Sequence, residues 1–169
     1  LFVENFSLTF ELALSLKEVF TKTKNLFHIT EESLDSMSKR NSEYIELLIG
    51  RFSKLQDMLG SKIFRSIVTL DFEETGSIKD TVNKMEKKYI IDDVSDWRDI
   101  RDARNNIIHE YVPRGEEAAK TLNMVYKLVP ELLKIVSNIV DYMQKENGLD
   151  MSQFNTKNLV IKTIPKGKK

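Results

Sequence analysis

The chain has 169 residues, of which 41% are hydrophobic and 31% charged, as is usual for a single helical domain with one core. Because it contains no cysteine, disulfides, zinc–thiolate sites and thiol nucleophiles are excluded. Its 26 Lys and Arg residues balance 26 Asp and Glu residues, which argues against a large nucleic-acid footprint, and no apolar stretch approaches the length of a membrane span.

Apolar residues recur at helical spacing along nearly the whole chain. We therefore predict an all-α fold, an up-and-down bundle of four main helices plus short helices. The first helix is predicted over residues 8–27 and is apolar on most sides, which indicates that it is well buried. Thr30, followed by two glutamates, then predicts a helix start or a turn.

A long helix is predicted over residues 41–71, with Gly50 and Gly60 inside it. Each glycine costs about 1 kcal/mol relative to alanine unless a neighbouring helix approaches closely there. After a break, Ser77 can cap a shorter helix over residues 78–89.

The next helix is predicted to start at Asp92 or Ser95 and to end before Pro113, because proline disfavours helical geometry in the residue that precedes it. The last long helix is predicted over residues 114–145, with a kink or turn at Pro130.

Residues 1–147 are predicted to form the helical domain, and residues 148–169 a lysine-rich tail. After Asp150 the chain has no acids, five lysines and one short apolar run at residues 159–161. The tail either docks on this chain, docks on another molecule, or is an ordered terminus without a docking role.

The most distinctive string is RNNIIHEY, at residues 104–111 near a predicted helix end. Arginine can neutralise charge on a pentavalent phosphate. Histidine can take up and return protons near neutral pH. Neither property needs a metal or a cofactor, so Arg104, Asn105 and His109 are candidate catalytic residues for phosphodiester cleavage. Acids outnumber arginines six to four over residues 92–114, so any RNA site there must be a local focus of arginine.

On a helical wheel Arg104 lies in the middle of the apolar face, while one flank of that face carries Arg101, Asp102, Asn105 and His109. A guanidinium at such a position is costly unless it is paired or faces water. Two explanations are open. Arg104 satisfies a carboxylate in the core while His109 caps the helix, or the face lies at a solvated seam between two protomers.

The spacing Arg-x4-His-x-Tyr, with a polar residue after the arginine, resembles the signature of the HEPN superfamily, in particular of HepT-like toxins paired with a nucleotidyltransferase antitoxin. Residues 51–65 and 97–100 are also similar to such proteins, and the similarity spans roughly residues 5–146. The resemblance implies a HEPN-like homodimer in which the motif helices of both protomers meet. It also implies an endoribonuclease, with RNA and a nucleotidyltransferase antitoxin as partners.

In that chemistry His109 would activate the ribose 2′-hydroxyl, Arg104 would stabilise the phosphorane and Asn105 would position the phosphate or the imidazole. The product would be a 2′,3′-cyclic phosphate, formed without a metal. Arg101 and Arg114 are further candidates for binding RNA.

The resemblance gives Tyr111 a separate role, as the residue to which the antitoxin attaches AMP. The alternative is that Tyr111 packs on the apolar face beside Trp97. A competing function is a non-catalytic substrate-binding or scaffold subunit of a nucleotidyltransferase. We expect the protein in the cytoplasm, with which the lack of cysteine is compatible.

Overall fold

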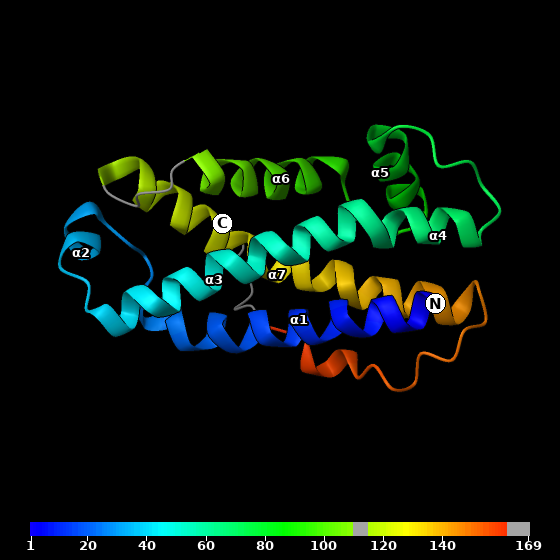
Figure 1. Ribbon diagram of the computed structural model, residues 1–169, viewed down its shortest axis with the longest axis horizontal. Coiled ribbons are helices and arrows are strands. Elements are labelled where there is room, and N and C mark those ends of the chain that lie inside the picture. Colours follow the sequence, from blue (N-terminus) through cyan, green and yellow to red (C-terminus); the bar gives the residue numbers. More distant parts are fainter. Residues whose placement is uncertain (110–114, 162–169) are drawn as a thin grey trace, which may run out of the picture.

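The computed structural model describes the backbone of residues 1–109 and 115–161, and the side chains of these residues except Ile108 and His109. The described part is helical and contains no strand, which confirms the predicted all-α bundle (Figure 1). None of its helices is long and apolar enough to cross a membrane.

Four main helical segments form the bundle, and short helices connect them. The elements in chain order are α1 (Phe2–Thr23), the 3-10 turn η1 (Lys24–Leu26), α2 (Glu31–Asp35), α3 (Lys39–Met58), the π-helical turn η2 (Leu59–Ile63), α4 (Phe64–Leu70), α5 (Ile78–Lys87), α6 (Val94–His109), α7 (Gly115–Lys145) and the 3-10 turn η3 (Thr156–Asn158). The main segments are α1, α3 continued by η2 and α4, α6, and α7.

The predicted caps at Thr30 and Ser77 are confirmed. The Thr30 hydroxyl accepts a hydrogen bond from the Ser33 backbone N–H, and the Ser77 hydroxyl accepts one from the Asp80 backbone N–H. In each case the third helical residue bonds back to the cap, which closes a capping box. Local side-chain chemistry therefore sets where both short helices begin.

The predicted start of the motif helix is wrong. The helix begins at Val94, with the Asp93 carboxylate accepting a hydrogen bond from the Ser95 N–H at 2.7 Å, so neither Asp92 nor Ser95 is its first residue. Of the two alternatives predicted at Pro130, the turn is wrong because Pro130 lies inside the continuous helix α7, and the kink stays a prediction.

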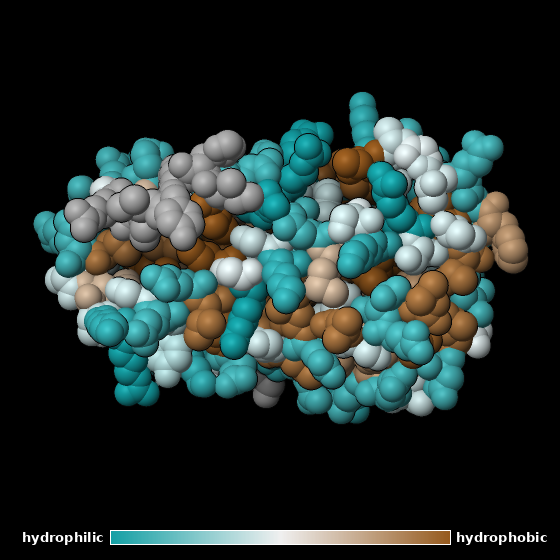
Figure 2. All heavy atoms as spheres, in the orientation of Figure 1, coloured by the Kyte–Doolittle hydropathy of each residue, from teal (hydrophilic) through white to brown (hydrophobic). Residues whose placement is uncertain are grey.

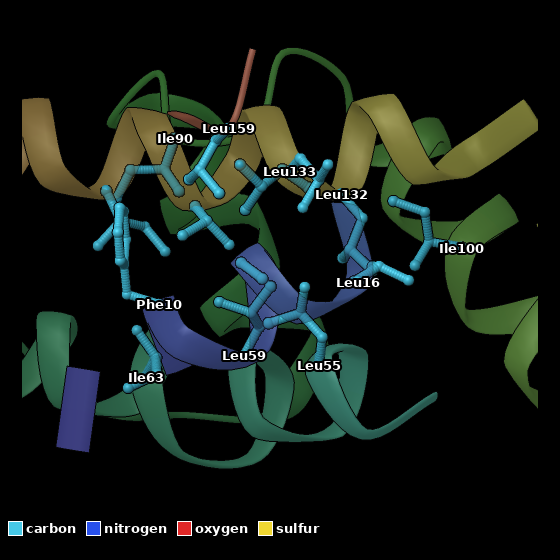
Figure 3. Packing of buried hydrophobic residues seen from close by; sticks show 14 of the residues in the cluster. Phe10, Leu16, Leu55, Leu59, Ile63, Ile90, Ile100, Leu132, Leu133 and Leu159 are labelled. Carbon is cyan, nitrogen blue, oxygen red and sulfur yellow. The ribbon is translucent and has the colours of Figure 1, made fainter. Parts of the chain in front are cut away.

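The core is formed where α1, α3 and α7 pack together and α6 closes one side (Figures 1 and 3). Apolar side chains from all four main segments meet there, and Figure 3 labels several: Phe10, Leu16, Leu55, Leu59, Ile63, Ile100, Leu132 and Leu133. Burial of each such side chain contributes about 1.5–3 kcal/mol. On the face shown in Figure 2, hydrophilic and apolar side chains are interspersed.

Gly60 lets α6 approach the turn η2 closely. A Cβ atom at Gly60 would lie 3.1 Å from the Trp97 indole, whereas one at Gly50 would meet nothing within 4 Å. The close approach expected of a helical glycine is therefore present at Gly60 and absent at Gly50. Trp97 in turn packs on Phe64, with ring centroids 4.8 Å apart, which fixes the position of α6.

The described part of the tail docks on this chain. Met151, Phe154 and Leu159 are buried, and the Phe154 ring packs on Phe6 at a centroid distance of 5.0 Å. The Lys17 ammonium group donates a hydrogen bond to the carbonyl of residue 158. The segment up to residue 161 thus returns along α1 (Figure 1).

Candidate active site

Helix α6 carries the predicted motif and is anchored by its apolar face. Trp97, Ile100 and Ala103 are all at most 3% exposed and face the core. Beside this buried face, Arg104 and Asn105 are partly buried, and Arg101 is exposed.

Arg104 pairs with a carboxylate on the neighbouring helix. Its Nη2 atom donates a hydrogen bond to Asp57 Oδ2 at 2.8 Å, and the two side chains are 25% and 48% exposed, respectively. The single chain thus contains a carboxylate partner for Arg104, but Asp57 lies at the surface rather than in the core.

The guanidinium keeps unused donors. Of its five N–H groups, one has a partner among the described residues, and the buried Nε has none. A buried N–H without a partner is costly. An arginine in this state is suited to bind a further acceptor such as a phosphate oxygen.

Asn105 and Arg101 line the flank beside Arg104. Asn105 is half-buried and Arg101 is exposed. Within the described part of the chain neither side chain has a hydrogen-bond or ion-pair partner, so both groups are available to a ligand.

His109 is the last described residue of α6, and only its place on the helix is known. It lies five positions after Arg104, which on an ideal helix corresponds to about 140° around the axis and about 7.5 Å along it. Helix geometry alone therefore does not bring these two residues of one chain to a common point. Tyr111 and Arg114, the other predicted site residues, lie outside the described residues.

The opposite end of α6 is acidic. Burial, together with the neighbouring carboxylates of Asp93 and Asp92, raises the pKa of Asp96. Burial also raises the pKa of Glu131 on α7, whose Oε1 atom is buried without a hydrogen-bond partner among the described residues. The raised pKa of Asp96 reflects the negative charge of the carboxylates gathered at this end, and that charge repels a phosphate, so an anionic ligand is favoured at the end of α6 that carries Arg104.

Asp57 is the site residue that the sequence analysis missed. It lies inside the segment similar to HEPN proteins, yet nothing assigned it a role. The available signal is a face of polar and small residues at helical spacing, formed by Ser53, Gln56 and Asp57 on α3 and Gly60 on η2. Such a face, unlike the apolar stripe of the same helix, indicates contact with another polar surface.

Comparisons of the chain with models of protein families, with curated proteins and with solved structures found no match. The resemblance to HEPN proteins stays a prediction from the residues quoted above. Among the described residues, no group of three or more His, Asp or Glu side chains could hold a metal ion.

Proposed function

We propose that the protein is a metal-independent endoribonuclease, the toxin of a toxin–antitoxin pair, which cleaves RNA in the cytoplasm. The observation that supports this proposal is the state of Arg104. Its guanidinium is three-quarters buried, is anchored through one bond to Asp57, and keeps unused donors beside the free amide of Asn105. His109 follows on the same helix.

In the proposed reaction the imidazole of His109 takes the proton of the ribose 2′-hydroxyl. The 2′-oxygen then forms a bond to phosphorus and the bond from phosphorus to the 5′-oxygen breaks. A protonated imidazole returns the proton to the leaving 5′-oxygen. Arg104 neutralises charge on the phosphorane, and Asn105 orients the phosphate. The products are a 2′,3′-cyclic phosphate and a 5′-hydroxyl, and DNA is no substrate because it lacks the 2′-hydroxyl.

The site is proposed to need two copies of the chain. Because Arg104 and His109 are about 140° apart on one helix, two copies of α6 related by a two-fold axis are the simplest way to bring an arginine and a histidine together. The expected oligomer is therefore a homodimer. Light scattering of the purified protein tests this expectation, and a monomer at tens of micromolar would contradict it.

Regulation is proposed to act through a nucleotidyltransferase antitoxin that attaches AMP to Tyr111. An added phosphate would place negative charge and bulk two residues from His109 and so repel RNA. Coexpression with such a partner should add the mass of AMP to the peptide that contains Tyr111. If the unmodified toxin is neutralised equally well, steric capping is the mechanism and the modification is refuted.

One observation favours the second candidate, a non-catalytic substrate-binding or scaffold subunit of a nucleotidyltransferase. Asp57 already balances the charge of Arg104 within the single chain, as a purely structural ion pair would. The presence of Asn105 and His109 on the same helix favours the ribonuclease, because a scaffold has no need of them.

Cleavage of total RNA in the presence of EDTA tests the proposal. The wild type should cleave and leave cyclic phosphate ends, while Arg104→Ala and His109→Ala should be inactive yet folded. Arg98→Ala is a matched control, since Arg98 is an exposed arginine of the same helix. Cleavage that requires Mg²⁺, or that survives the loss of His109, contradicts the mechanism. A wild type that binds a nucleotidyltransferase without cleaving RNA supports the second candidate.

A further inference from the structure

An open groove lies between residues 24–31 and the first turns of α7. It shares no residue with the candidate active site. Its lining combines an aromatic floor, a polar edge and a rim of lysines.

The floor is a column of stacked rings. The Tyr126 ring lies between Phe27, at a centroid distance of 4.0 Å and an interplanar angle of 14°, and Phe20, at 4.4 Å and 15°. Phe27 and Tyr126 both line the groove, and Phe27 is the last ring of the column among the described residues. Such a column presents a π-face on which a further flat ring can stack.

The polar edge is held rigidly by Asn123. Its Oδ1 accepts from the Ile29 N–H at 2.8 Å, and its Nδ2 donates to the Ile29 carbonyl at 2.7 Å. The same Nδ2 atom lies 3.3 Å from His28 Nε2. Because an amide nitrogen only donates, Nε2 must accept, and a neutral His28 carries its hydrogen on Nδ1. The exposed His28 therefore offers a donor beside the aromatic floor.

The rim carries unpaired positive charge. Lys24 and Lys127 are exposed, come from opposite walls of the groove, and have no ion-pair partner within the described part of the chain. Lys120 is paired with Glu116 at 3.0 Å and so adds no net charge. Glu31 is the one acid of the lining without an ion-pair partner among the described residues.

We infer that this groove binds single-stranded RNA, with a base stacked on Phe27 and Tyr126 and the flanking phosphates at Lys24 and Lys127. The identity of the ligand as RNA rests on the proposed ribonuclease function. The inference extends that function by naming the surface that holds the substrate. A flat aromatic face between two unpaired lysines fits a base with its phosphates. A purely apolar peptide would gain nothing from either lysine.

The groove lies within reach of the proposed cleavage site. Its first α7 residue, Glu116, follows Gly115 directly, and six peptide links join Gly115 to His109. A chain of that length spans at most about 22 Å. A short RNA segment can therefore occupy the groove and reach the motif at the same time.

The experiment measures binding of a labelled 2′-O-methyl oligoribonucleotide, which lacks the nucleophilic hydroxyl and so stays intact. The double variant Lys24→Gln/Lys127→Gln should bind about tenfold more weakly and should reduce the slope of log Kd against log salt by about 1.4, or 0.7 for each lost phosphate contact. The control Lys62→Gln/Lys79→Gln removes two exposed lysines elsewhere and should change neither value.

Two further variants test whether a base stacks on the aromatic floor and whether the bound molecule is negatively charged. Phe27→Leu keeps apolar bulk but removes the ring, and should weaken binding about tenfold. Met124→Glu adds a negative charge at a position that lines the groove and is 46% exposed, so it should weaken binding without disturbing the core. Thermal melting confirms that each variant is folded.

The results separate this inference from the proposed function. Failure of the wild type to bind the oligonucleotide, or equal binding by groove and control variants, overturns the inference. So does a Met124→Glu variant that binds RNA normally but loses a dimer in light scattering, because a second copy then covers the groove. If RNA is cleaved with unchanged KM by the groove variants, the ribonuclease stands and the groove assignment falls. If the wild type binds the oligonucleotide through the groove but cleaves no RNA, the groove assignment stands and the ribonuclease falls.

Discussion

The ion pair between Arg104 and Asp57 gives the sharpest test of the proposed function. Removal of a purely structural pair lowers stability only slightly, whereas removal of a catalytic arginine also greatly lowers the cleavage rate. The pair has a single hydrogen bond of 2.8 Å, and the Asp57 side chain is 48% exposed. An ion pair screened by water to this extent contributes about 1 kcal/mol. Loss of the packed arginine stem adds a similar amount, so Arg104→Ala should destabilise the protein by about 1–2 kcal/mol.

A destabilisation of that size cannot explain a large loss of activity. A domain with about 5 kcal/mol of stability that loses 2 kcal/mol remains about 99% folded. Removing a group that stabilises transition-state charge lowers the rate about 10²–10³-fold. A hundredfold decrease in single-turnover cleavage by Arg104→Ala, measured beside urea unfolding of the same protein, therefore belongs to the chemistry.

The double variant then defines the role of Asp57. Asp57→Ala leaves the cation in place but removes its anchor, and misplaced groups cost activity. We expect about a tenfold decrease in the cleavage rate with little change in KM. In the Arg104→Ala background the loss of Asp57 should have no further effect, since nothing remains to be positioned. Rate effects that multiply in the double variant would refute a positioning role for Asp57.

Three further predictions concern stability. Asp71→Ala should destabilise the protein by about 1–3 kcal/mol in urea unfolding, because the Tyr142 hydroxyl loses its 2.7 Å acceptor and the largely buried Lys88 ammonium keeps only Glu73 as an ion-pair partner. Burial favours a higher pKa for Asp71, but its hydrogen bonds outweigh this and hold the pKa below its usual value, so the stabilisation should be present above about pH 4 and lost below it. Burial raises the pKa of Glu131, so its charged form destabilises the fold, and Glu131→Gln should raise the Tm near neutral pH but not below about pH 4. Phe72 is 99% exposed at a φ of 57°, and Phe72→Gly should stabilise the protein by about 1 kcal/mol in the same urea assay.

The helices and their caps were predictable because their causes are local. Thr30 and Ser77 each bond to residues three positions away, and helical periodicity needs only one turn of context. The start of α6 was misplaced because three closely spaced residues, Asp92, Asp93 and Ser95, offer similar capping oxygens. Sequence spacing does not decide between neighbours of this kind.

The contacts that build the candidate site were not predictable in the same way. Asp57 lies 47 positions before Arg104, and the chain holds 26 acids that could have served as its partner. Docking of the tail depends likewise on Phe154 meeting Phe6 across almost the whole chain. The alternatives for Arg104 and for the tail were open because pairing between distant residues depends on how the helices pack. Helical periodicity does not specify that packing.

Charge along α6 explains how a chain with no net charge could still hold RNA. Residues 92–99 contain four acids and one arginine, whereas residues 100–109 contain two arginines and one acid. The half that contains the two arginines is also the end of α6 that precedes α7, whose first turns line the groove with Lys24 and Lys127. A phosphate is thus repelled at one end of the helix and attracted at the other, over a distance longer than the Debye length of about 8 Å at physiological salt. The net charge measures only the sum of these two effects, whereas binding depends on the local field at the phosphate.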